Sequence, residues 1–152
     1  MQTPSVAELI PILQTAIGPV ILISGVGLLL LSMTNRLSRV IDTTRLLGDN
    51  IPPVGDPARS PIEAQLQILW SRARLIRTAI FLASSSALTA SLLIIVIFLT
   101  ALFRSDAAII IITLFAITMA LLVTSLIVFI RDVNKSLTAL RLELRTHRIG
   151  DI

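Results

Sequence analysis

The sequence predicts an all-α membrane protein in which three transmembrane helices extend into a cytoplasmic bundle resembling a coiled coil. The first observation is composition. Of 152 residues, 55% are hydrophobic and only 14% are charged, whereas soluble domains carry about 25% charged residues. The second observation is that three long runs lack any charge, and the third is that apolar residues recur at helical spacing beyond each run.

The uncharged runs are Leu9–Asn35, Thr78–Phe103 and Ala107–Ile130. A helix needs about 20 apolar residues to cross the hydrocarbon core of a bilayer. We therefore expect spans at about 9–35, 78–103 and 107–130. The first is expected to be retained rather than cleaved as a signal peptide, because no Lys or Arg precedes it and it is longer than a signal-peptide core.

The first helix is expected to continue beyond its span to about residue 47. Residues 36–47 place apolar and charged side chains on different faces, and no Gly or Pro interrupts them. Residues 48–61 contain four Pro and two Gly, so they form the one predicted break.

The second helix is expected over about 61–103. Ser60 is the predicted N-cap, Pro61 occupies the first turn, and Glu63 completes a capping box. Apolar residues then alternate at spacings of four and three toward the second span.

The third helix is expected over about 107–149, because the same alternation follows the third span. The cytoplasmic part is thus predicted to be a helical hairpin (36–77, with its loop at 48–61) and a C-terminal helix (131–149).

Basic residues predict the orientation. Seven Arg lie between the first two spans and five Lys or Arg follow the third, whereas only Arg104 separates the second span from the third. Because cytoplasmic loops are rich in Lys and Arg, we expect the N-terminus outside and the C-terminus in the cytoplasm.

Charged residues gather at the predicted membrane exit. They are Arg36, Arg39, Asp42, Arg72, Arg74, Arg77, Arg131 and Asp132. Arg36, Arg77 and Asp132 are expected at one level, with Asp42 and Arg72 about 8–9 Å further out. We expect Asp132 or Asp42 to contact an Arg of another helix; the alternative is that these charges are solvated. Six basic residues are also expected near anionic lipid headgroups, either through general attraction or in a specific pocket; they are Arg36, Arg39, Arg74, Arg77, Arg131 and Lys135.

Small residues form stripes within the spans. On the first span the stripe comprises Thr15, Gly18, Leu22, Gly25 and Ser32, and on the second Ala79, Ala83, Ala87 and Ser91 recur every four residues. Such stripes allow close helix packing in lipid, which is the favoured interpretation. The alternative is that the first stripe lines a pore in an oligomer, since hydroxyls and backbone can line pores.

Several functions are disfavoured. The spans contain no Asp, Glu, Lys, Arg or His, whereas pumps, ion-coupled carriers and intramembrane hydrolases usually place such residues there. The chain has no Cys and one His, so no metal site or other cofactor is expected. Trp70 is the single aromatic of the cytoplasmic segments, which disfavours nucleic-acid binding. We expect Trp70 to pack between the cytoplasmic helices rather than contact headgroups.

Four segments resemble the bacterial membrane proteins of the DUF2721 family. They are Ala16–Val20, Asn35–Asp42, Arg72–Ile76 and Arg131–Val133. The second resembles the family's R-L-x-R-aliphatic-aliphatic-D block, although Thr43 stands where an Arg is expected to follow the Asp. The resemblance implies a small multi-span protein of a bacterial inner membrane and no assigned activity.

We expect a non-enzymatic homo-oligomer whose cytoplasmic helices drive assembly, with a channel or pore as the concrete hypothesis. The alternative is a membrane scaffold or accessory subunit that binds another protein through those helices. An enzyme acting on lipid ranks third, because no convincing nucleophile and base are found at the membrane surface.

Overall fold

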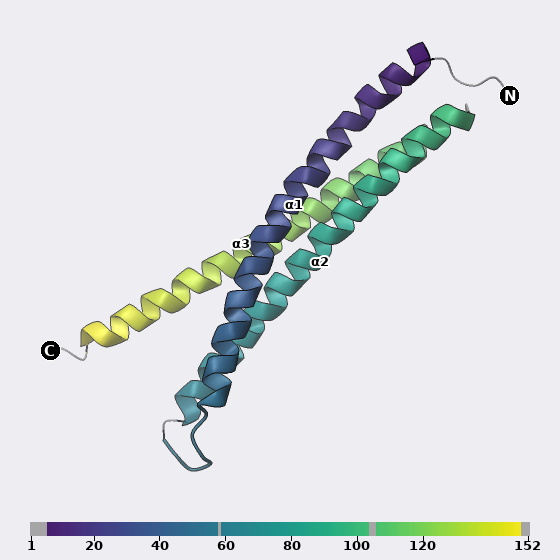
Figure 1. Cartoon of the computed structure of the whole chain (residues 1–152). Coiled ribbons are helices and arrows are strands. Elements are labelled where there is room, and N and C mark those ends of the chain that lie inside the picture. The colour runs from purple at the N-terminus through teal and green to yellow at the C-terminus, as the bar shows by residue number, and fades with distance from the viewer. Residues whose placement is uncertain (1–5, 58, 104–105, 150–152) are drawn as a thin grey trace. The chain divides into compact units, whose positions relative to one another are not determined.

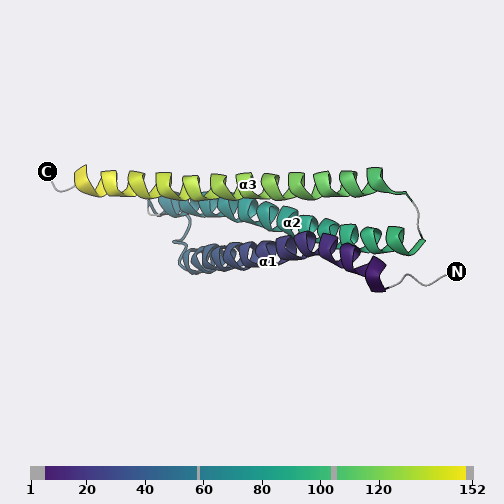
Figure 2. The ribbon, with the colours of Figure 1, turned by 90° about the horizontal axis from the view of Figure 1, so that it is seen from above.

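The secondary-structure elements of the described residues in the computed structural model are all α-helices. The structure describes residues 6–57, 59–103 and 106–149, with side chains over 10–57, 59–103 and 106–134. Its helices are α1 (Val6–Asp49), α2 (Arg59–Phe103) and α3 (Ala108–Ile149). Figures 1 and 2 show each as one continuous ribbon. The prediction that three helices run unbroken beyond the uncharged runs is confirmed, whereas their coiling about one another stays a prediction.

The helix ends follow local hydrogen bonding. At the end of α1, the Asn50 side-chain amide donates to the carbonyl of Leu46 at 2.8 Å, and the helix ends at Asp49, at the start of the predicted break over residues 48–61. At the start of α3, the Asp106 carboxylate accepts a 3.3 Å bond from the backbone N–H of Ala108. A side-chain oxygen placed there satisfies a donor that has no partner within the helix.

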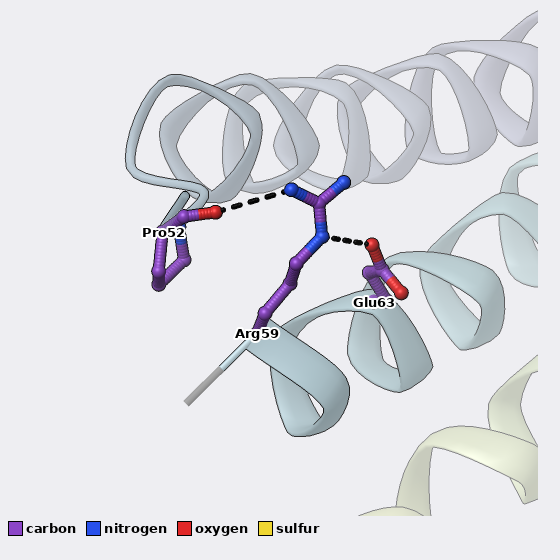
Figure 3. A network of polar contacts seen from close by, with 3 residues as sticks. All are labelled: Pro52, Arg59 and Glu63. Carbon is purple, nitrogen blue, oxygen red and sulfur yellow. Dashed lines mark hydrogen bonds and ion pairs between the residues drawn. The ribbon is translucent and has the colours of Figure 1, made fainter. Parts of the chain in front are cut away.

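The start of α2 differs from the prediction. The helix begins at Arg59 instead of residue 61, and Figure 3 shows how Arg59 links the loop to the first turn. Its Nε donates to Glu63 Oε1 at 2.7 Å, and its Nη1 donates to the carbonyl of Pro52 at 3.3 Å. Glu63 therefore pairs with a guanidinium one turn earlier, where the sequence pattern had assigned it to a capping box with Ser60.

The chain forms two compact units. The span unit comprises Met1–Leu31 and Phe81–Thr124, and the hairpin unit comprises Ser32–Ile80 and Ser125–Ile152. The span unit contains most of each uncharged run. The hairpin unit contains the predicted cytoplasmic segments.

The core of the hairpin unit joins residues of all three helices. Met33 and Val40 of α1 and Ile76 and Ala79 of α2 are buried together, with half-buried apolar side chains around them that include Val128 and Phe129 of α3. The apolar faces predicted for the first two cytoplasmic segments thus pack against each other. The corresponding residues of the C-terminal segment, Leu137, Leu140 and Leu144, lie outside the described side chains.

The expectation that Trp70 packs between the cytoplasmic helices was wrong. Its side chain is 65% exposed, so it does not pack between the helices of its own chain. It follows the half-buried Leu69 by one residue, which places it about 100° around the helix from the packed face.

The buried face of α2 is a single regular stripe. Its residues alternate at spacings of three and four and are Ile76, Ala79, Ala83, Ser86, Ala90, Leu93 and Ile97. The four-residue stripe expected from the sequence coincides with this buried face only at Ala79 and Ala83. Its later members are turned away from the contact, since Ala87 is half-buried and Ser91 is exposed. A four-residue step advances about 400° around a helix, so the drift of about 40° per step carries later members away from the contact.

Buried hydroxyls connect α2 to α3. Within the span unit, Ser86 Oγ donates to the carbonyl of Thr118 at 3.0 Å. Within the hairpin unit, Ser125 Oγ donates to the carbonyl of Ala79 at 2.7 Å. Small side chains and interhelical hydrogen bonds stabilise helix contacts where lipid removes the hydrophobic driving force.

Replacing Ser125 with alanine is expected to lower the free energy of unfolding by about 1 kcal/mol, because the buried bond to Ala79 is lost. Ser91→Ala is the matched control. Its hydroxyl is exposed and bonds within its own helix to Ala87, so a change below about 0.5 kcal/mol is expected. Denaturant unfolding in detergent micelles measures both, and equal effects would contradict the assigned contact.

Candidate functional site: a buried carboxylate between two arginines

Asp132 is the one fully buried carboxylate among the described residues. It lies on α3 in a polar heptad stripe, since the buried residues among the described side chains of this helix, 108–134, are Thr118, Ser125 and Asp132. Positions seven apart lie on nearly the same face of a helix. The face of α3 that packs inward therefore presents hydroxyls first and then a charge.

Two guanidinium groups from different helices flank this carboxylate. Arg36 Nη1 of α1 lies 3.9 Å from Asp132 Oδ2, and Arg72 Nε of α2 lies 3.5 Å from Oδ1. The Asp132 side chain is 0% exposed, whereas those of Arg36 and Arg72 are 33% and 21% exposed. We call these three residues the Asp132 cluster; all of them belong to the hairpin unit.

The aromatic ring of Phe129 supports one arm of the cluster. The guanidinium carbon of Arg36 lies 5.3 Å from the ring centroid, within the range of a cation–π contact. Phe129 precedes Asp132 by three residues on α3, so ring and carboxylate share one side of that helix. Arg36 is thus held by two groups of the same neighbouring helix.

The Asp132 cluster contains more positive than negative charge. A buried carboxylate is costly unless it is paired, and the two arginines provide that pairing by proximity. Neither oxygen of Asp132 accepts a hydrogen bond from a described residue. Two positive charges face one negative charge, so the cluster carries a net positive charge.

The structure confirms part of the charged group predicted from the sequence. Asp132 contacts arginines of two other helices, as expected for one of the two aspartates, while Asp42 is exposed. The remaining members are also exposed; they are Arg39, Arg74, Arg77 and Arg131.

Arg72 contacts Asp132 from a different level along its helix. Its position along α2 placed it outside the level of Asp132, yet its side chain reaches that carboxylate. Five residues separate Arg72 from Arg77, which is about 7.5 Å along the helix. A long flexible arginine side chain spans such a distance.

The small-residue stripe of α1 lies off the packed face. Thr15, Gly18, Gly25 and Ser32 are exposed and Leu22 is half-buried. The buried residues of α1 are instead Ala16, Val26, Met33 and Val40. A Cβ built on Gly18 or Gly25 would meet no atom within 4 Å. The stripe therefore does not pack helices within one chain.

Phe129 and the buried hydroxyls of α3 were not among the residues expected at the site from the sequence. A signal for the hydroxyls was present, since Thr118, Ser125 and Asp132 repeat at intervals of seven. Among the described residues, no group of three His, Cys, Asp or Glu side chains is placed to hold a metal ion. The chemistry that the Asp132 cluster shows is ion pairing between three helices.

The fold defines a multi-pass membrane protein, because all three helices are long and apolar enough to cross a membrane. The particular family follows from comparison of sequences. A family model described as "Protein of unknown function (DUF2721)" matches residues 16–142, and the chain belongs to that family. The matched region includes the whole Asp132 cluster, and the resemblance noted in the sequence is confirmed. No curated protein and no solved structure matches the chain.

Proposed function

We propose that this protein is a non-enzymatic homo-oligomer whose assembly encloses a pore across a bacterial inner membrane. The N-terminus lies outside and the hairpin lies in the cytoplasm, as the distribution of Lys and Arg favours. The observation that carries the proposal is the unoccupied small-residue face of α1.

This face is suited to close approach by another helix. Gly18 and Gly25 lie seven residues apart, both are exposed, and the space beside each is open. Glycine allows helix backbones to approach closely in lipid, where packing has to replace the hydrophobic effect. No described helix of the same chain occupies this face, so a second copy is the partner we propose.

The same face has groups that line pores. Thr15 and Ser32 contribute hydroxyls, and hydroxyls serve as pore linings without any charge inside the membrane, while the glycines make the contact with the neighbouring copy. In the proposed oligomer α1 surrounds the axis, with Arg36 as the first charge beyond the uncharged run.

Gly25→Leu is expected to reduce the oligomer to monomers and to abolish conductance, because the added side chain fills the proposed contact. Gly27→Leu is the matched control. Gly27 is also exposed with open space around it, but it lies about 200° around α1 from Gly25, so assembly is expected to persist. The mass of the purified protein in detergent and conductance in planar bilayers measure the two effects. A monomeric and silent wild-type protein would contradict the proposal.

A second candidate is a scaffold or accessory subunit that binds another protein. The observation that favours it is apolar surface on the hairpin unit, where Leu46, Val54, Ile68 and Trp70 are exposed. Crosslinking in native membranes separates the candidates. A dominant foreign product favours the scaffold, and products containing only this chain favour the homo-oligomer.

A further inference from the structure

We propose that Arg36 and Arg72, positioned by Asp132, form a binding site for the phosphate of an anionic phospholipid headgroup. The proposal depends on the membrane setting of the helices and does not require an oligomer or a pore. Asp132 is a positioning residue in this site, and the two arginines are its ligand-binding groups.

The site lies at the depth of the headgroups. Arg36 is the first charged residue after the uncharged run of α1, and Asp132 follows the uncharged run of α3 by two residues. Two runs that cross the bilayer therefore end at residues that contact each other. Residues that directly follow a span of this length lie in the interfacial layer of the bilayer, where lipid phosphates are located.

The charges of the site favour an anion. The Asp132 cluster has two guanidinium groups and one carboxylate, so its formal charge is positive. Arg36 remains one-third exposed beside the buried carboxylate, so part of its side chain is accessible to a ligand. A guanidinium presents five donors in a planar fork that matches two phosphate oxygens.

The site is preorganised, which distinguishes it from the other basic residues at this depth. Asp132 draws the side chains of Arg36 and Arg72 toward one point, and the Phe129 ring lies against Arg36. Holding these side chains before binding removes part of the ordering cost. Arg77 is exposed and no such contact is found for it, so we expect from it only the general attraction of a surface charge, a factor of about five in affinity.

The full chain in detergent micelles provides the test, with native mass spectrometry measuring bound lipid. The probes are dioleoyl phosphatidylglycerol, dioleoyl phosphatidylcholine and inorganic phosphate. We expect one saturable phosphatidylglycerol per chain, with weaker binding of the zwitterionic lipid and of inorganic phosphate. Inorganic phosphate that binds as tightly as phosphatidylglycerol would overturn the assignment to a lipid.

Two lysine variants separate a site from general attraction. Arg36→Lys and Arg77→Lys both conserve charge, but lysine loses the planar fork. We expect the first to weaken phosphatidylglycerol binding by about tenfold and the second by less than about twofold, which corresponds to loss of a forked contact only at Arg36. Equal effects of the two variants would refute the site.

Asp132→Asn gives a second test, in which the two explanations predict opposite signs. The substitution makes the chain more positive by one charge, so general attraction predicts tighter binding of the anionic lipid. Loss of positioning predicts weaker binding, with Asp132→Glu retaining more affinity than Asp132→Asn. Circular dichroism and gel filtration establish whether the variant is folded, and if it is not, the lysine pair decides the question.

Discussion

Replacing Asp132 with alanine is expected to lower the free energy of unfolding by about 3 kcal/mol. The substitution removes a fully buried carboxylate and leaves Arg36 and Arg72 facing each other without it. Breaking a buried ion pair by deleting one partner costs about 3–5 kcal/mol. The lower end applies here because both arginines are partly exposed and can turn toward water or headgroups. Reversible unfolding in mixed detergent micelles measures the change.

Asp42→Ala is the control for this prediction. It removes the same charge from the same unit, but Asp42 is exposed and forms no ion pair with another described side chain. Surface substitutions of this kind change stability by about 0.5 kcal/mol or less. If both variants lost equal stability, the assignment of Asp132 as the centre of a three-helix contact would be wrong.

Ala83→Leu is expected to destabilise the span unit by about 2–3 kcal/mol. Ala83 is fully buried on the regular stripe of α2, and an added isobutyl group would force the packed helices apart. Overpacking of a close contact costs about 1–3 kcal/mol. Thermal unfolding in micelles measures the effect.

Ser91→Leu is the companion variant that distinguishes the two stripes. Both positions belong to the four-residue stripe expected from the sequence, but the structure leaves Ser91 exposed. A leucine there faces lipid, so stability is expected to change by less than about 0.5 kcal/mol. Comparable losses at both positions would favour the four-residue stripe over the stripe found in the structure.

Much of the architecture could be predicted from local features. The uncharged runs and the helical periodicity beyond them placed the helices at 9–47, 61–103 and 107–149. The structure extends the first two by two or three residues and begins the third one residue later. The break at 48–61 followed from its Pro and Gly content. These features act over a few neighbouring residues, so a single sequence contains them.

The candidate site could be predicted only in part. Asp132 or Asp42 was expected to meet an arginine of another helix because the charged groups fall at similar depth along the helices, and the structure shows that Asp132 does. The participation of Arg72 and Phe129 depends on side-chain reach and on the rotation of each helix about its axis. The rotation of a helix about its axis decides which of several charged side chains at one depth turns toward the other helices. The residue pattern of one helix does not specify which side chain of another helix that charge will contact.

The amino-acid sequence by itself determined that this chain has three long helices, where each begins and ends to within a few residues, and which stretches are apolar enough to cross a membrane. Only the tertiary structure decided that Ala83 is buried and Ser91 exposed, that the glycines of α1 face away from the chain, and that Asp132 lies between two arginines. The physical reason is that length and hydropathy are properties of one segment, whereas burial depends on how the packed helices are rotated against one another.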